Sequence, residues 1–218
     1  MAINLENELT ELRRMVLSMG AIVEQRLSVV VDAIVNHDYP QAQRVRHGDR
    51  DVDQMDLDIE AACLRVLALS QPVASDLRFL LAVLRINSDL ERIGDLAKSI
   101  AKRVLDLSQS PEYGLPPSLS EMADRTREML AETMAAFAEE DAESCRRIHR
   151  SDHQLDDIQK EIFQWATAEI PRHVESTEGV INTLSIARAL ERIGDLATNI
   201  AEDVIFLVEG SIVRHRVV

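Results

Sequence analysis

Four pairs of acidic residues share one spacing, in which an aspartate follows another acidic residue four positions later. The pairs are Asp49/Asp53, Glu91/Asp95, Asp152/Asp156 and Glu191/Asp195. Because residues four apart stack on one face of an α-helix, each pair would present two carboxylates side by side. Carboxylate oxygens bind hard cations such as Mg²⁺, Mn²⁺, Ca²⁺ or ferric iron, and groups of them can bridge several ions. The spacing therefore predicts metal-binding faces at these eight residues.

Two of these pairs lie in an identical octapeptide. The sequence LERIGDLA occupies residues 90–97 and again 190–197, which indicates an internal duplication. The other two pairs occupy equivalent positions on the middle helix of each half. Gathered carboxylates repel one another unless cations or arginines compensate them, and both interpretations remain open. The arginines nearby in sequence are Arg85, Arg92, Arg188 and Arg192.

The octapeptide also carries a glycine in what should be a helix interior. Gly94 and Gly194 each cost about 1 kcal/mol there relative to alanine. We therefore expect a neighbouring helix to approach closely at both glycines.

Other catalytic patterns are absent from the sequence. It has no Gly-x-Ser-x-Gly, no Walker loop and no dinucleotide-binding fingerprint. Ferritin-like di-metal oxidases use Glu-x-x-His, which does not occur here. His149 and His153 flank Asp152, but arginines replace them in the first half, which favours solvent-facing histidines. We expect a protein that is not an enzyme; a carboxylate-bridged metalloenzyme and a purely structural helical scaffold are the alternatives.

Six long helices are expected to position the acidic pairs. Apolar residues recur every three or four positions, and prolines or capping residues separate the periodic segments. Asp38 and Asp141, at equivalent positions of the two halves, are predicted to cap the second and fifth helices. The predicted helices span about 5–36, 40–69, 73–107, 118–140, 142–170 and 177–209.

The six helices divide into two units of three. Proline and glycine concentrate between the third and fourth helices, where the sequence reads SQSPEYGLPPS. Short turns between long helices imply antiparallel packing. The predicted fold is all-α, with two tandem three-helix bundles from an internal duplication. Its predicted divisions are a first repeat at 1–108, a linker at 109–117, a second repeat at 118–210 and a tail at 211–218.

Composition narrows the class of protein further. Hydrophobic residues make up 46% of the 218 residues but aromatic residues only 3%, so the core must be aliphatic. A net charge of −14 disfavours nucleic-acid binding. No signal peptide and no apolar run near the roughly 20 residues of a membrane span is evident, so we expect a cytoplasmic protein without a transmembrane segment. Cys63 and Cys145 show no zinc-binding pattern and should be buried, reduced side chains.

The chain resembles the PhoU family. The resemblance covers about residues 5–209 and rests on the two LERIGD segments, at 90–95 and 190–195, and on the segment PVASDLR at 72–78. It implies a six-helix protein of two similar bundles, commonly dimeric. Some members bind iron or other metal clusters through E(D)xxxD motifs, which match the eight acidic residues named above. The ions implied are iron, zinc, magnesium or manganese.

The resemblance also implies a regulatory role. Members of the family are negative regulators of the phosphate-starvation regulon and restrain phosphate uptake. They are thought to act as adaptors between the ATPase of the phosphate ABC transporter and the sensor histidine kinase PhoR. The second repeat has PRHVESTEGV from Pro171 in place of the PVASDLR segment. Partner binding is therefore expected to differ between the two repeats.

Overall fold

All regular structure in the described part of the chain is helical. The computed structural model describes residues 4–36, 38–47, 50–108, 114–151 and 153–211. Its elements are α1 (Leu5–Asn36), α2 (Tyr39–His47), α3 (Arg50–Ser70), α4 (Ala74–Leu107), α5 (Pro117–Glu139), α6 (Ala142–Ser151), α7 (His153–Glu169), the 3₁₀ turn η1 (Val174–Ser176) and α8 (Thr177–Glu209). The predicted fold class, two tandem bundles with six long helices, is confirmed.

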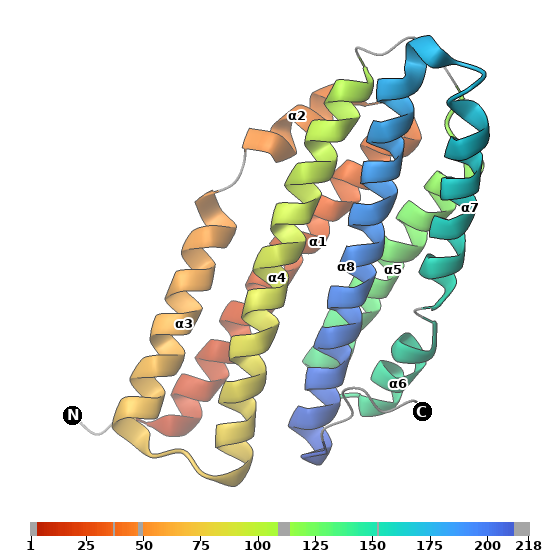
Figure 1. The fold of residues 1–218 in the computed structure, drawn as a ribbon. Helices are drawn as coiled ribbons and strands as arrows, with labels where there is room; N and C mark the ends of the chain where they lie inside the picture. The colour runs from red at the N-terminus through yellow and green to blue at the C-terminus, as the bar shows by residue number, and fades with distance from the viewer. Residues whose placement is uncertain (1–3, 37, 48–49, 109–113, 152, 212–218) are drawn as a thin grey trace.

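The structure describes the second and fifth predicted helices in two parts each. Each is described as a short helix followed by a long one, α2 with α3 and α6 with α7. In Figure 1, α2 lies at a steep angle to α3. The sequence between the paired helices contains Gly48 and Asp49 in one repeat and Asp152 in the other. These three residues lie outside the described part of the chain.

The predicted caps are present at the start of both short helices. The Asp141 carboxylate accepts hydrogen bonds from the backbone N–H groups of Glu143 and Ser144, each at 3.0 Å. The Asp38 carboxylate accepts one from the N–H of Gln41 at 3.3 Å. Such bonds satisfy donors that have no partner within the helix. The hydrogen bonds to Ser144 also lower the pKa of Asp141.

The helices form two layers. Figure 1 shows α3, α4, α8 and α7 side by side across the front of the molecule, with α1 and α5 behind them. The largest contact between any two elements joins α4 to α8, one from each repeat. Buried aliphatic side chains from both repeats make one continuous core. The two repeats therefore share a single hydrophobic interior.

α4 and α8 run antiparallel, so equivalent residues of the two repeats meet across the interface. The Arg85 guanidinium lies 3.1 Å from the Asp203 carboxylate, which is only 1% exposed. At the other end of the interface, Arg103 donates a hydrogen bond of 3.1 Å to the Asn182 side chain. The octapeptides at 90–97 and 190–197 lie between these two contacts. The duplicated segments thus cross at the centre of the molecule.

The two cysteines are buried and unpaired, as predicted. Burial raises the pKa of each thiol to about 12, so neither is a thiolate at neutral pH. Cys63 and Cys145 therefore serve as small apolar side chains of the core.

Two further predictions concern membrane-spanning helices and the boundaries of the two repeats. No helix in the described ranges is long and apolar enough to cross a membrane. The proposed linker at 109–117 and tail at 211–218 fall largely outside the described residues, so these domain boundaries stay predictions. Within the described part, α5 begins at Pro117.

Candidate metal centre

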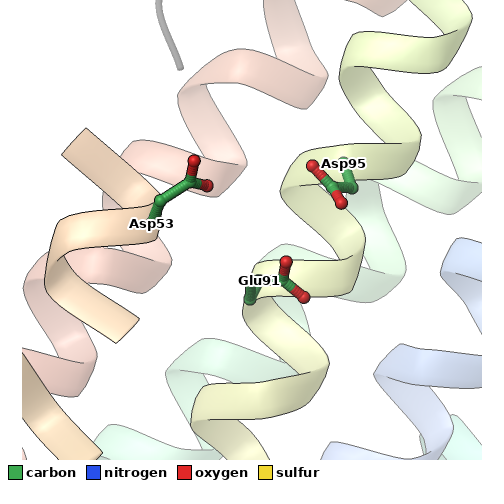
Figure 2. A group of neighbouring side chains, drawn as sticks. All are labelled: Asp53, Glu91 and Asp95. Carbon is green, nitrogen blue, oxygen red and sulfur yellow. The ribbon is translucent and has the colours of Figure 1, made fainter. Parts of the chain in front are cut away.

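Three of the predicted acidic residues come together in the first repeat. Asp53 on α3 faces Glu91 and Asp95, which lie one turn apart on α4 (Figure 2). One carboxylate oxygen from each of the three residues lies within 4.8 Å of the others. Asp53 and Asp95 are exposed and Glu91 is partly buried. The structure therefore gathers acidic residues from two helices at one point on the surface.

Packing of α3 on α4 produces this convergence. A Cβ atom built on Gly94 would lie 3.4 Å from Cγ1 of Val52, the buried residue that precedes Asp53. Alanine at position 94 would therefore make only an ordinary van der Waals contact with this side chain. The close approach predicted from the octapeptide is thus not found at Gly94, where a methyl group would fit.

A fourth carboxylate belongs to this group and was missed in the sequence. Asp56 lies three residues after Asp53, so it shares that face of α3. The buried side chain of Asn87 on α4 donates hydrogen bonds to the Asp56 carboxylate at 2.6 Å and to its backbone oxygen at 3.1 Å. Extending the acidic pattern by one further i, i+3 step would have found Asp56. No sequence signal links Asn87 to it.

Electrostatic repulsion is evident within the group. Partial burial raises the pKa of Glu91, and the charges of Asp95, Asp56 and Asp53 raise it further, while Arg92 lowers it. Burial, Glu60 and Asp53 likewise raise the pKa of Asp56, and the hydrogen bond from Asn87 lowers it. We call Asp53, Asp56, Glu91 and Asp95 the first face.

Few basic side chains compensate the first face. Lys98 lies 3.1 Å from the Asp95 carboxylate. Two of the arginines considered from the sequence have other partners, since Arg85 pairs with Asp203, and Arg92 lies 3.4 Å from Asp89. Compensation by arginine is therefore only a small part of the electrostatics of the first face.

The equivalent residues of the second repeat make a different arrangement. Glu191 and Asp195 on α8 lie close enough to Asp156 on α7 to interact. Partial burial raises the pKa of Glu191, and the charges of Asp195 and Asp156 raise it further. However, Gln159 stands at the position of Asp56 and donates a hydrogen bond to Glu191. We call Asp156, Gln159, Glu191 and Asp195 the second face.

The possible ligand atoms of the second face are not gathered as closely as those of the first. Among the described residues, only Asp53, Glu91 and Asp95 form a trio of possible metal ligands within 4.8 Å. Alanine replaces Asn87 at position 187, so nothing there holds a further carboxylate. Two predicted ligands, Asp49 and Asp152, lie outside the described residues.

Packing around the second glycine is also tighter. A Cβ atom on Gly194 would come within 2.3 Å of Cδ1 of Leu155, the buried residue that precedes Asp156. The predicted close approach is thus confirmed at Gly194 and not at Gly94. In the second repeat a larger residue, leucine in place of valine, fills the same space.

The histidines lie away from these trios. The Nδ1 atom of His149 on α6 is 4.0 Å from the Glu202 carboxylate on α8. His153, the first residue of α7, is exposed. Neither belongs to a group of possible metal ligands in the described ranges. A ferritin-like set of histidine and glutamate ligands is therefore not assembled by these residues.

The donor set of the first face fits a hard cation. All its possible ligand atoms are carboxylate oxygens, and bound positive charge would oppose the partial burial and the repulsion that together raise the pKa of Glu91. Such sets suit Mg²⁺, Mn²⁺, Ca²⁺ and ferric iron better than soft metals, which prefer sulfur ligands. The residues present are thus compatible with the metal chemistry expected from the sequence.

Comparisons with known proteins agree with this architecture. The PhoU domain family matches residues 16–104 and 119–204. The chain is 38% identical over 208 residues to the phosphate-specific transport system accessory protein PhoU of Serratia marcescens, covering 95% of this chain and 86% of that protein. The protein of the same name from Escherichia coli K12 is 36% identical with the same coverage.

Solved structures give the same result. The crystal structure of PhoU from Pseudomonas aeruginosa superposes with a TM-score of 0.92 at 34% identity, covering 95% of this chain and all of that one. That of the phosphate transport system regulatory protein PhoU from Streptococcus pneumoniae gives 0.84 at 32% identity, covering 96% and 99%. The expectation of a non-enzymatic protein is confirmed by the family, which comprises regulatory accessory proteins. With both repeats matched and the whole fold reproduced, the chain belongs to the PhoU family.

Proposed function

We propose that this protein is the accessory protein of a phosphate-specific transport system and a negative regulator of the phosphate-starvation regulon. The observation that carries the proposal is the similarity to PhoU proteins at 36–38% identity over 95% of the chain. In this role the protein works in the cytoplasm, commonly as a homodimer. It links the ATPase of the phosphate ABC transporter to the sensor kinase PhoR and restrains phosphate uptake.

The architecture supports an adaptor rather than a catalyst. Four long helices lie side by side across one face and provide a broad, rigid surface (Figure 1). The chain carries a formal net charge of −14, and both carboxylate faces contribute to it. Acidic surfaces of this kind would dock on basic surfaces of the transporter ATPase or the kinase. Complementary charge sets orientation and encounter rate more than affinity.

We further propose that the first face holds a metal ion. Asp53, Glu91 and Asp95 supply the ligands, with Asp49 from the same acidic pair. Asp152, Asp156, Glu191 and Asp195 form a second, weaker candidate because of the substitutions described above. Iron, zinc, magnesium and manganese are the candidate ions, and the all-oxygen donors favour the harder ones. A bound cation would neutralise the face and so change which partner surface it attracts.

Deletion of the gene in its own host tests the regulatory role. Alkaline phosphatase activity in phosphate-rich medium should be high in the deletion strain and low again when a plasmid supplies the protein. Unchanged low activity after deletion would contradict the proposal. Alanine at Asp53, Glu91 and Asp95 together, with Asp58→Ala on the exposed side of α3 as a control, then tests whether repression depends on the first face.

Partner binding tests the adaptor role directly. Purified wild-type protein and the triple alanine variant are compared for binding to the transporter ATPase and to the cytoplasmic part of PhoR. Loss of binding to either partner in the triple variant, but not in Asp58→Ala, would support docking through the first face. Equal binding by all three proteins would exclude it.

A further inference from the structure

A groove runs between α4 and α8 at the centre of the molecule, where the two octapeptides cross. Its walls are built from three matched pairs, with one residue of each pair from each repeat, and from Asn199 of α8. The pairs are Arg92/Arg192, Asp95/Asp195 and Leu96/Leu196. The groove is therefore nearly symmetric about the axis that relates the repeats.

Antiparallel packing of α4 on α8 explains the pairing. The contacts Arg85–Asp203 and Arg103–Asn182 join the same two helices on either side of the crossing. They fix the register in which the duplicated segments face each other. The groove is thus preorganised by the two contacts and does not depend on a mobile segment.

The charged groups of the groove are accessible to a ligand. The Arg92 side chain is 62% exposed, with a long contact of 3.4 Å to Asp89 on its own helix. Within the described residues, no hydrogen bond or ion pair holds the guanidinium of Arg192. Asp95 contacts Lys98 at 3.1 Å and also remains exposed. Two guanidinium donors and two carboxylate acceptors therefore line one open site.

We propose that this groove binds inorganic phosphate in a protonated form. The guanidinium groups of Arg92 and Arg192 would donate charge-assisted hydrogen bonds to the unprotonated oxygens, as arginine does for phosphate groups generally. The P–OH group would donate to the carboxylate of Asp95 or Asp195, because an ionised carboxylate can only accept. A tetrahedral ion has two-fold axes, so it can present equivalent oxygens to both repeats.

This mixture of donors and acceptors selects among oxyanions. At neutral pH phosphate retains at least one proton, whereas sulfate retains none and would face the carboxylates only with acceptor oxygens. Acceptor facing acceptor forms no hydrogen bond between the ion and the carboxylate and adds charge repulsion. The groove should therefore prefer phosphate to sulfate. Because the surroundings are acidic and open to solvent, binding should be weak, in the millimolar range.

The inference is tested by titrating the purified protein with inorganic phosphate. Binding is measured by isothermal titration calorimetry and by the ³¹P NMR line width. Arg92→Gln and Arg192→Gln should each weaken phosphate binding about tenfold, since each removes charge-assisted hydrogen bonds. Arg188→Gln is the matched control, because it removes the same charge from α8 one turn before Arg192 without lining the groove. It should bind phosphate like the wild type.

Sulfate provides the specificity measurement. Sulfate should compete poorly against phosphate for the wild-type protein, and Asp195→Asn should reduce that discrimination by replacing an acceptor with an amide. Three results would each overturn the inference: no saturable phosphate binding by the wild type, equal binding by Arg192→Gln and Arg188→Gln, or equal affinity for sulfate. Circular dichroism of every variant shows whether the fold is retained. Phosphate binding is measured on purified protein, so a negative result would leave the proposed regulatory role in cells intact.

Discussion

The first and second faces use the same glutamate and aspartate from identical octapeptides, but different neighbours from the helix packed beside them. In the first repeat α3 adds Asp53 and Asp56, and Asn87 orients Asp56. In the second repeat α7 adds Asp156 and Gln159, whose amide donates to Glu191. One face gathers four carboxylates, with Lys98 paired to Asp95, and the other has three, with an amide in place of the fourth. Duplicated residues therefore do not imply duplicated sites when the partner helix differs.

The largest difference between the two faces should be in their affinity for metal ions. Asp53→Asn removes a proposed ligand and should weaken Mn²⁺ binding by at least about 100-fold, more than loss of a residue that only orients a ligand. Asp156→Asn should change total Mn²⁺ binding much less. Calorimetric titration of metal-free protein measures both, with Asp58→Asn as the control. Equal losses from Asp53→Asn and Asp156→Asn would show that the faces are equivalent after all.

The role of Asn87 can be tested at the same site. Asn87→Ala removes the hydrogen bonds to Asp56 and should weaken Mn²⁺ binding about tenfold, because residues that orient ligands contribute on this scale. Alanine already stands at the equivalent position 187, so the substitution makes the first repeat resemble the second. If Mn²⁺ affinity were unchanged while Asp53→Asn abolished binding, Asp56 would be irrelevant to the metal.

The two helix glycines should respond to the same substitution in different ways. Gly194→Ala places a methyl group in the space of the Leu155 side chain and should lower the free energy of unfolding by about 1–2 kcal/mol. Gly94→Ala makes only an ordinary contact with Val52 and gains helix propensity, so its effect should lie within about 1 kcal/mol of zero. Urea denaturation measures both. Greater destabilisation by Gly94→Ala would mean that the packing difference has been misjudged.

The smallest expected effect concerns pH. The raised pKa of Glu91 means that the folded state binds its proton more readily than the unfolded state does. The ionised form therefore destabilises the fold, and this loss appears as pH rises through the raised folded pKa. Glu91→Gln should increase stability at neutral pH by less than about 1 kcal/mol and have little effect below the unfolded pKa.

Glu191→Gln provides the comparison for that measurement. The pKa of Glu191 is also raised, but fewer carboxylates surround it and Gln159 donates to it. Its substitution should therefore stabilise the protein less than Glu91→Gln does. Thermal melts of both variants at neutral and acidic pH give the difference. A larger gain from Glu191→Gln would show that the second face is the more strained of the two.

Much of this organisation could be read from the sequence, because it depends on local patterns. Apolar periodicity located α1 and α8 at their observed bounds, and the acidic spacing found Asp53, Glu91 and Asp95. Asn87 and Gln159 could not be assigned, because their roles depend on which residue faces them across a helix interface. Apolar spacing also did not predict that α2 and α3, and likewise α6 and α7, are described as separate helices. Tertiary pairing, rather than local propensity, decided the roles of Asn87 and Gln159.

The continuous core shared by the two repeats affects how the protein unfolds. Because α4 and α8 bury their side chains against each other, neither bundle can lose its helices without exposing the interior of the other. Heating should therefore produce one cooperative transition, with the calorimetric and van't Hoff enthalpies in agreement. Isolated halves of the chain would expose a long apolar stripe and should aggregate or pair with each other. The duplicated protein would then behave in solution as a single folding unit.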